Sequence, residues 1–246
     1  MNDALTHDAF LGGRLCLWQP THGYRAGIDP VLLAASVHAE PGQSVLDLGC
    51  GVGAAALCLG ARMPGLRLTG VEVQPQYAAL ARRNGGDSLE VIEADLTALP
   101  LDLRQRQFDH VIANPPYFDR AASRAAQDAG RETATGEATP LHIWVRVAAK
   151  RLAPKGYAHI IHRVERLPDI LGAMHEHLGS VEVLPIAPRQ GRSAELVIVR
   201  ARKSGRAAFR LHAPLILHQG DRHEGDREDY FPAIRAVLRD GAPLEF

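Results

Sequence analysis

The chain has 246 residues, of which 46% are hydrophobic and 23% are charged, and its formal net charge is zero. This length and composition are typical of one globular domain, and they exclude a disordered, collagen-like or coiled-coil chain. No apolar run reaches the roughly 18 residues that a membrane span requires, and the N-terminus has neither the basic nor the apolar region of an export signal. The three cysteines, Cys16, Cys50 and Cys58, have no CxxC spacing, which argues against a disulfide framework and a zinc site. We therefore expect a cytoplasmic protein that holds no metal.

Short apolar segments alternate with helical ones through the middle of the chain. Strands are predicted at 44–48, 67–72, 89–93, 108–113, 157–162, 181–186 and 194–201, and helices at 54–62, 75–84, 141–152 and 167–178. The last two strands have no helical segment between them, so they are expected to form an antiparallel hairpin. The pattern predicts an α/β fold with a Rossmann-like, doubly wound sheet of seven strands, mostly parallel with an antiparallel last strand at one edge.

Two flanking segments lie outside this alternation. The first, 1–43, carries a strand-like stretch at 14–18 and a helix at 29–38, for which Asp29 is a plausible N-cap before a proline. The last, 203–246, carries a strand at 209–217 and then an amphipathic helix. Its apolar face consists of Phe231, Ile234, Val237 and Leu238. The predicted organisation is an N-terminal segment at 1–43, a core at 44–202 and an extension at 203–246 packed on the core.

A glycine-rich loop follows the first core strand, in the sequence Asp47-Leu48-Gly49-Cys50-Gly51-Val52-Gly53. Glycines at Gly49, Gly51 and Gly53 let the backbone turn sharply and approach a ligand closely, because they have no Cβ. The spacing does not fit the GxGxxG fingerprint of dinucleotide binding. Asp47 at the start of the loop favours a ligand that carries an ammonium group or ribose hydroxyls.

Two further acidic residues end the next strands. Glu72 closes the second core strand, where a carboxylate can accept both hydroxyls of a ribose, and Asp95 follows the third, where it can accept from an exocyclic amine. A single such residue is more often a helix cap or a solvated loop acid. Three of them at successive strand ends, after a glycine loop, favour a nucleoside pocket.

The fourth core strand ends in Asn114-Pro115-Pro116-Tyr117. Two prolines stop the strand from pairing further and leave rigid carbonyl groups, while Asn114 adds an acceptor and Tyr117 a flat face for stacking. These groups fit a planar substrate with an NH₂ group, whose two protons the Asn114 oxygen and a proline carbonyl would accept. In isolation, a structural Pro-Pro turn packed by aromatic residues is about equally expected. Beside a nucleoside pocket, the functional interpretation is favoured.

These motifs together resemble class I S-adenosylmethionine-dependent methyltransferases. The glycine loop is similar to their cofactor loop, Glu72 to their ribose-binding acid, and Asp95 with Leu96 to the residues that hold the adenine. The Asn114–Tyr117 motif is similar to the signature of enzymes that methylate planar amino or amide nitrogens. The segment 23–29 and the helix after it resemble bacterial tRNA adenine-N6 methyltransferases that modify an adenine beside the anticodon of a valine tRNA. This resemblance implies S-adenosylmethionine as the cofactor, with Asn114 also beside it and Arg25 and Asp29 near its methionine end.

The implied reaction is methylation of the exocyclic amine of adenine in RNA, with tRNA as the expected substrate. Basic residues of the stretch 189–210 are candidates to hold the phosphate backbone, or else form a solvated arginine-rich edge. The candidates are Arg189, Arg192, Arg202, Lys203 and Arg206. The polar segment 119–139 is interpreted either as a lid ordered by RNA or as a simple loop.

Four other functions share part of this pattern. A protein-glutamine methyltransferase acts on a planar amide, but such enzymes carry a substantial N-terminal helical domain, so the 43 residues before the first core strand make this alternative weaker. A DNA adenine methyltransferase would need a target-recognition domain, and an rRNA guanine-amine methyltransferase would be expected to have an additional substrate domain. A nucleotide-binding module without catalysis is the fourth alternative, and the intact Asn-Pro-Pro-Tyr motif argues against it.

Overall fold

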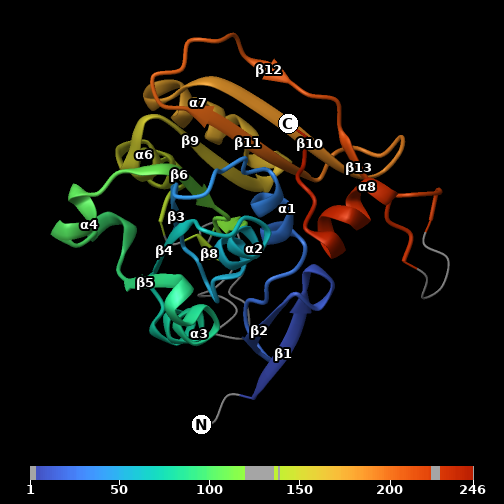
Figure 1. Ribbon diagram of the computed structural model, residues 1–246. Helices are drawn as coiled ribbons and strands as arrows, with labels where there is room; N and C mark the ends of the chain where they lie inside the picture. The colour runs from blue at the N-terminus through green and yellow to red at the C-terminus, as the bar shows by residue number, and fades with distance from the viewer. Residues whose placement is uncertain (1–3, 120–135, 138, 223–227, 246) are drawn as a thin grey trace.

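The computed structural model describes residues 4–119, 136–137, 139–222 and 228–245, and its centre is one large sheet (Figure 1). All seven predicted core strands are present in it. They are β3 (Ser44–Leu48), β4 (Arg67–Glu72), β5 (Leu89–Glu93), β6 (Phe108–Ala113), β9 (Leu152–Arg163), β10 (Gly179–Arg189) and β11 (Leu196–Arg202). The strand order is β12-β10-β11-β9-β6-β3-β4-β5, with β13 also paired to β10. The predicted α/β, mostly parallel, doubly wound sheet is therefore confirmed.

Two details of the sheet prediction were wrong. The sheet has nine strands rather than seven, because β12 (Arg210–Leu211) and β13 (Leu215–His218) add to β10 from the C-terminal part of the chain. The antiparallel strand β11 is not at an edge, since it pairs with β9 on one side and β10 on the other. The chain passes from β9 through α7 (Leu167–His177) to β10, and this crossover leaves the position between them for β11.

Helices cover both faces of the sheet, which makes its central strands hydrophobic on both sides. On one face, α1 (Asp29–Ala35), α2 (Ala54–Arg62) and α3 (Pro75–Gly85) contribute to one buried cluster. On the other face, α4 (Leu101–Gln105), α6 (Leu141–Arg151) and α7 contribute to a second. The central strand β3 is accordingly buried at every position. This covered sheet fixes the strand ends that carry the polar motifs.

The N-terminal segment forms a hairpin in which β1 (Leu5–Phe10) pairs with β2 (Leu15–Pro20) around a short turn, η1 (Leu11–Gly13). The strand β1 was not predicted, because its Thr, His and Asp residues lack an apolar pattern and its conformation depends on pairing with β2. Asn84 of α3 fixes the hairpin to the core. Its amide accepts from the backbone N–H of Trp18 at 2.8 Å and donates to the Trp18 carbonyl at 3.1 Å.

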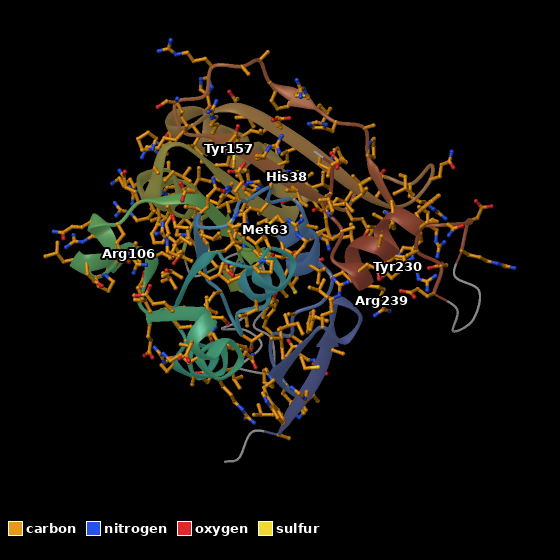
Figure 2. All side chains as sticks on the ribbon, viewed as in Figure 1. His38, Met63, Arg106, Tyr157, Tyr230 and Arg239 are labelled. Carbon is orange, nitrogen blue, oxygen red and sulfur yellow. The ribbon has the colours of Figure 1, made fainter. Side chains whose placement is uncertain are left out.

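The C-terminal segment differs from its prediction in two places. The single strand expected at 209–217 is divided into β12 and β13, because Pro214 between them has no N–H to donate to a ladder. The expected amphipathic helix is the short α8 (Pro232–Arg235) continued by η5 (Ala236–Asp240), beside Tyr230 and with Arg239 in its last turn (Figure 2). Ile234 of this helix is buried with α1 and α2, but Phe231 is 36% exposed.

The remaining short elements are η2 (Gly86–Ser88), η3 (Leu96–Ala98), η4 (Val164–Arg166) and a parallel pair of β7 (Phe118–Asp119) with β8 (Gly136–Glu137). Among the described residues, no helix is both long and apolar enough to span a membrane. The division of the chain into an N-terminal segment, a core and an extension stays a prediction.

Candidate functional site

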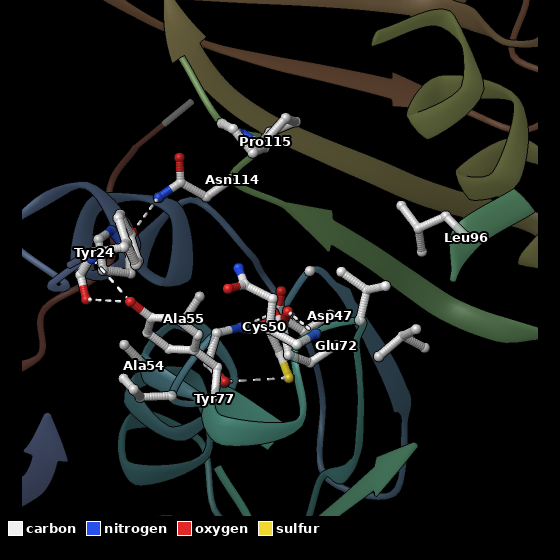
Figure 3. A pocket seen from close by; sticks show the side chains of 18 of the residues that line it. Tyr24, Asp47, Cys50, Ala54, Ala55, Glu72, Tyr77, Leu96, Asn114 and Pro115 are labelled. Atoms are coloured by element: carbon white, nitrogen blue, oxygen red, sulfur yellow. Dashed lines mark hydrogen bonds between the residues drawn. The ribbon is translucent and has the colours of Figure 1, made fainter. Parts of the chain in front are cut away.

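A cavity of about 260 Å³ lies at the carboxyl ends of β3, β4, β5 and β6 (Figure 3). Its walls come from the glycine loop, from the ends of these strands and from the segment before α1. The predicted site residues on the walls are Asp47, Gly49, Gly51, Glu72, Asp95, Leu96, Asn114, Pro115, Pro116 and Tyr117. The fold therefore brings together residues from four strand ends at one edge of the sheet, as the doubly wound topology requires.

The glycine loop forms the floor of this cavity and depends on backbone conformations that other residues rarely adopt. Gly49, Gly51 and Gly53 all have positive φ, at 65°, 56° and 86°. A Cβ on Gly49 would lie 2.5 Å from the ring of Trp144 on α6, and one on Gly53 would lie 2.9 Å from Leu89. The loop is therefore closely packed from behind, which holds its backbone toward the cavity.

The carboxylates of Asp47 and Glu72 are both buried on the cavity wall, at 2% and 6% exposure. Glu72 accepts from the backbone N–H groups of Gly51 and Gln74, each at 2.9 Å, so its carboxylate holds the glycine loop in place. Asp47 accepts from the Ala56 backbone N–H at 3.3 Å. Burial raises the pKa of Glu72 and raises that of Asp47 to about 8, and the neighbouring Glu72 charge adds to the Asp47 shift.

Asp95 lies on the cavity wall but also serves as a helix cap. One of its carboxylate oxygens accepts from both the backbone N–H and the hydroxyl of Thr97, each at 2.7 Å, at the start of η3. The side chain is exposed, and Leu96 beside it is buried. The capping role and a role in binding an amine use different oxygens, so Asp95 stays a predicted adenine contact.

The Asn-Pro-Pro-Tyr segment closes the cavity opposite the glycine loop. The amide nitrogen of Asn114 donates to the Tyr24 hydroxyl at 3.3 Å, which leaves its amide oxygen directed away from Tyr24 (Figure 3). The hydroxyl of Tyr117 donates to the carboxylate of Asp29 at 2.5 Å, which holds the Tyr117 ring. Burial raises the pKa of Asp29 and of Tyr117. Both polar side chains of the motif are thus held by residues from the N-terminal segment.

Asp29 is not the N-cap that the sequence indicated. Ile28 occupies the cap position of α1, and Asp29 is the first residue of the helix, where its carboxylate accepts from Tyr117. Asp29 is therefore in contact with Tyr117, which lines the cavity, but Asp29 is not itself among the described residues that line it.

Arg25, which was predicted to lie near the cofactor, is placed elsewhere. Its guanidinium is exposed and pairs with Asp8 of β1 at 2.7 Å, and the residue is not among the described residues that line the cavity. The hairpin supplies a carboxylate that the sequence did not associate with Arg25, because β1 itself was not predicted.

The basic stretch proposed to bind RNA is divided between two opposite edges of the sheet. Arg189 and Arg192 follow the carboxyl end of β10, on the same edge as the cavity, whereas β11 runs back and carries Arg202, Lys203 and Arg206 to the other edge. Seven strand residues at about 3.3 Å each separate the two groups by about 20 Å. The basic residues of 189–210 therefore do not form one continuous patch, and their role in binding RNA stays a prediction.

Several of these basic residues already have partners within the protein. Arg189 pairs with Asp229 at 2.5 Å and donates to the carbonyl groups of Gln219 and Gly220. At the other edge, Arg202 donates to the Lys155 carbonyl at 3.2 Å, and Lys203 donates to the Leu152 carbonyl at 2.7 Å. These bonds join the C-terminal segment and the β11 end to the sheet. Arg192, by contrast, is exposed on the hairpin tip at the cavity edge.

Three aromatic residues of the cavity were missed by the sequence analysis. Tyr24 lies within the 23–29 segment that carried the family resemblance, but Arg25 and Asp29 drew attention as the charged residues. Tyr77 on α3 accepts from the Tyr24 backbone N–H at 2.9 Å, and Trp144 packs behind Gly49. Neither of the last two has a local sequence signal, since each reads as one apolar position of an amphipathic helix.

The expected lid at 119–139 lies almost wholly outside the described residues. Within the described ranges, no group of three or more His, Cys, Asp or Glu side chains could hold a metal ion.

The comparisons with known proteins agree with this geometry. The chain matches the model of the family described as "Methyltransferase small domain" over residues 27–188, which is more than half of its length. The chain belongs to this family. The resemblance to S-adenosylmethionine-dependent methyltransferases that the motifs indicated is thereby confirmed.

Individual relatives of this methyltransferase carry a more specific name. A tRNA1(Val) (adenine(37)-N6)-methyltransferase from Porphyromonas gingivalis is 33% identical over 66% of this chain and 68% of its own length. A protein of the same name from Yersinia enterocolitica is 36% identical over 47% of this chain and 48% of its own. The match thus spans about two thirds of the first relative and half of the second.

Solved structures show the same fold. The crystal structure of a predicted O-methyltransferase from Agrobacterium tumefaciens covers 88% of this chain with a TM-score of 0.71 and 28% identity, and 98% of that chain is covered. A 16S rRNA N2 G1207 methyltransferase of T. thermophilus, solved with AdoMet and guanosine, covers 81% of this chain and is covered over 50% of its own, with a TM-score of 0.58 and 21% identity. The likeness to the second structure concerns the fold alone.

Proposed function

We propose that this methyltransferase transfers a methyl group from S-adenosylmethionine to the exocyclic amine of an adenine in tRNA, in the cytoplasm. The observation that carries the proposal is the Asn114 amide at the end of β6, whose oxygen is directed away from Tyr24 beside the rigid Pro115 on the cavity wall. The tRNA adenine-N6 methyltransferase names of the relatives support the same substrate class.

The residues around the cavity fit the cofactor. The loop backbone at Gly51 is open toward the cavity, since a Cβ there would meet only the Tyr24 ring at 3.7 Å. Two buried carboxylates, Asp47 and Glu72, face a ligand that carries an ammonium group and ribose hydroxyls. When bound, S-adenosylmethionine supplies a methyl group on a positively charged sulfur. Asp47, Glu72 and the glycine loop would hold it, with Asp95 and Leu96 at its adenine.

The Asn-Pro-Pro-Tyr segment then positions the base. The amide oxygen of Asn114 and the carbonyl of Pro115 accept the two protons of the adenine amine, and the ring of Tyr117 supplies a stacking face. Orienting the amine in this way directs its nitrogen lone pair toward the methyl group. Positioning and hydrogen bonding supply the acceleration, so a strong base is not required before attack. The amine loses a proton to solvent after the new C–N bond has formed.

An RNA substrate must present its adenine outside a base stack. An unpaired loop nucleotide satisfies this requirement at a cost of a few kcal/mol for unstacking. The exposed Arg192 at the cavity edge is available to contact the phosphate backbone of such a loop. The anticodon loop of a tRNA has these features. The relatives' names give adenine 37 of a valine tRNA as their target, which is consistent with an unpaired loop nucleotide.

The test is methyl transfer from labelled S-adenosylmethionine to unmodified total tRNA, followed by nucleoside analysis. We expect label in N6-methyladenosine, and we expect Asn114→Ala to lower the rate by at least about 100-fold. The matched control is His175→Ala, at an exposed position of α7 away from the cavity. Unmodified release factor is tested in parallel. Label in protein glutamine, with none in RNA, would replace this proposal with the glutamine alternative.

A further inference from the structure

The Asn114 amide is in contact with a tyrosine that lies 90 residues away in the chain. The amide nitrogen of Asn114 donates to the hydroxyl oxygen of Tyr24 at 3.3 Å (Figure 3). Tyr24 belongs to the segment between β2 and α1, and its ring also forms part of the cavity wall beneath Gly51. This contact therefore joins the N-terminal segment directly to the substrate end of the cavity.

Tyr24 is itself firmly held. The Tyr24 backbone N–H donates to the Tyr77 hydroxyl at 2.9 Å, and that hydroxyl donates to the Tyr24 carbonyl at 3.3 Å. Tyr77 is a buried residue of α3, so these two bonds fix Tyr24 to the core helix that follows β4. The backbone of Tyr24 is consequently fixed by the fold, and its ring lies beside Gly51 on the cavity wall.

The orientation of a primary amide decides what it can recognise. Its oxygen accepts hydrogen bonds and its NH₂ group donates them, yet the two ends have nearly the same shape. An adenine amine presents two donors, so only the oxygen end of Asn114 can pair with it. The reversed amide would set NH₂ against NH₂ and leave buried donors unpaired.

The charges around Tyr24 favour the productive orientation. Burial, and after it the negative charge of nearby Asp29, raise the pKa of Tyr24, so its hydroxyl stays protonated. Carboxylates also attract the hydroxyl proton more strongly than the neutral Asn114 amide does. A lone pair on the Tyr24 oxygen is thereby left to accept the Asn114 N–H.

We propose that Tyr24 is a positioning residue that sets the orientation of the Asn114 amide, so that its oxygen and not its nitrogen faces the amine of the substrate. This inference rests on the proposed function, because the need for an acceptor comes from an amino group. It extends that function by assigning a part in substrate orientation to the N-terminal segment.

The first experiment compares Tyr24→Phe with the wild-type protein in methyl transfer to tRNA. Removing the hydroxyl leaves the ring in the cavity wall, so we expect kcat to fall by about tenfold while KM for S-adenosylmethionine changes by less than about twofold. The matched control is Tyr157→Phe, a tyrosine within β9 that pairs with Arg202 away from the cavity edge of the sheet, and this change should leave both constants unchanged. A rise in the cofactor KM with unchanged kcat would contradict the proposal.

The second experiment removes the need for orientation. Asn114→Asp places a carboxylate there, whose two oxygens both accept, so no reversed form exists. In this background, Tyr24→Phe should lower kcat by less than about threefold, although it lowers kcat about tenfold beside Asn114. An equal loss in both backgrounds would show that Tyr24 acts by packing alone and would overturn the inference.

The third experiment needs no turnover. We expect one of the two Nδ2 hydrogens of Asn114 to exchange with solvent more slowly than the other in nuclear magnetic resonance spectra of the wild-type protein, because one is bound to Tyr24. The signal is assigned by its loss in Asn114→Asp, and it should shift in Tyr24→Phe. Equal and rapid exchange of both hydrogens would overturn the inference. If the wild-type protein methylates no adenine but shows the slow hydrogen, then the proposed function fails while the orientation by Tyr24 stands.

Discussion

Replacing Asp47 by Asn is expected to change the stability of the protein and its affinity for the cofactor in opposite directions. Asp47 is 2% exposed, and burial raises its pKa from 3.8 to about 8. Between these two pH values the unfolded chain carries an ionised Asp47 while the folded protein keeps the proton. The folded state therefore binds more protons, and its stability falls as pH rises. The slope from this one group is about 1.4 kcal/mol per pH unit, or about 3 kcal/mol between pH 5 and pH 7.

Asparagine keeps the shape of the side chain and its hydrogen bond from the Ala56 N–H, but it cannot ionise. We therefore expect Asp47→Asn to be more stable than the wild-type protein at pH 7. The stability difference between the two proteins should be about 3 kcal/mol larger at pH 7 than at pH 5. A bound ammonium group favours the ionised form of Asp47, whereas asparagine cannot become negatively charged, so the affinity of Asp47→Asn for S-adenosylmethionine should fall at least about tenfold. The stabilising substitution is thus expected to impair the enzyme, which is a common relation at binding sites.

The assay is urea unfolding at pH 5, 6 and 7 without cofactor, together with calorimetric titration of S-adenosylmethionine at pH 7. Asp221→Asn, at an exposed position, is the matched control and should shift neither quantity. The reasoning is refuted if the difference between Asp47→Asn and the wild-type protein does not change with pH, or if Asp47→Asn is the less stable protein at pH 7. Either result would mean that the Asp47 carboxylate is ionised in the folded protein.

Three further predictions concern other parts of the molecule. His110 on β6 is 5% exposed, and burial lowers its pKa to about 4, so on acidification the unfolded chain takes up a proton at this residue before the folded protein does. The wild-type protein should therefore lose about 2 kcal/mol of stability through His110 between pH 7.5 and pH 5. In urea unfolding, His110→Gln should reduce the loss between these pH values by that amount, whereas His175→Gln at an exposed position should not. Gly49→Ala combines a φ of 65° with a contact at 2.5 Å to Trp144, so it should lower stability by about 3 kcal/mol and weaken cofactor binding. The control is Gly42→Ala, at a φ of 90° but with no neighbour within 4 Å. If Gly49→Ala loses no more stability than Gly42→Ala, the packing argument is contradicted. Arg192→Ala should weaken tRNA binding and reduce its salt dependence, while Arg206→Ala at the opposite edge should change neither; the reverse order in a filter-binding titration would place the RNA at the other edge.

Local sequence patterns were sufficient for the core of the fold. The strands at 44–48, 67–72, 89–93 and 108–113 were predicted with the bounds of β3, β4, β5 and β6, because strands between helices are short, mostly apolar runs that give way to polar or turn-forming residues. The β1 strand and the break between β12 and β13 were missed, since both depend on which strand they pair with. Pairing partners are not encoded within a short window of sequence.

The cavity shows the same division. The sequence by itself indicated several of the residues on its walls, because a parallel sheet brings the carboxyl ends of its strands to one edge, and Asp47, Glu72 and Asn114 each lie at or directly after such an end. It also determined the need for glycine in the loop, since a backbone that turns with positive φ excludes a Cβ.

Only the tertiary structure decided how these groups are oriented and which charges remain available to a ligand. The bonds from Tyr24 to Asn114 and from Tyr117 to Asp29 join segments about 90 residues apart, and such contacts have no periodic signature in the chain. The basic stretch at 189–210 looked continuous because its residues are close in sequence. A strand moves the chain by about 3.3 Å per residue, so β11 carries Arg202 and its neighbours to the opposite edge. Only folding determined that, of the five predicted basic residues, Arg192 is the one exposed at the sheet edge that holds the cavity.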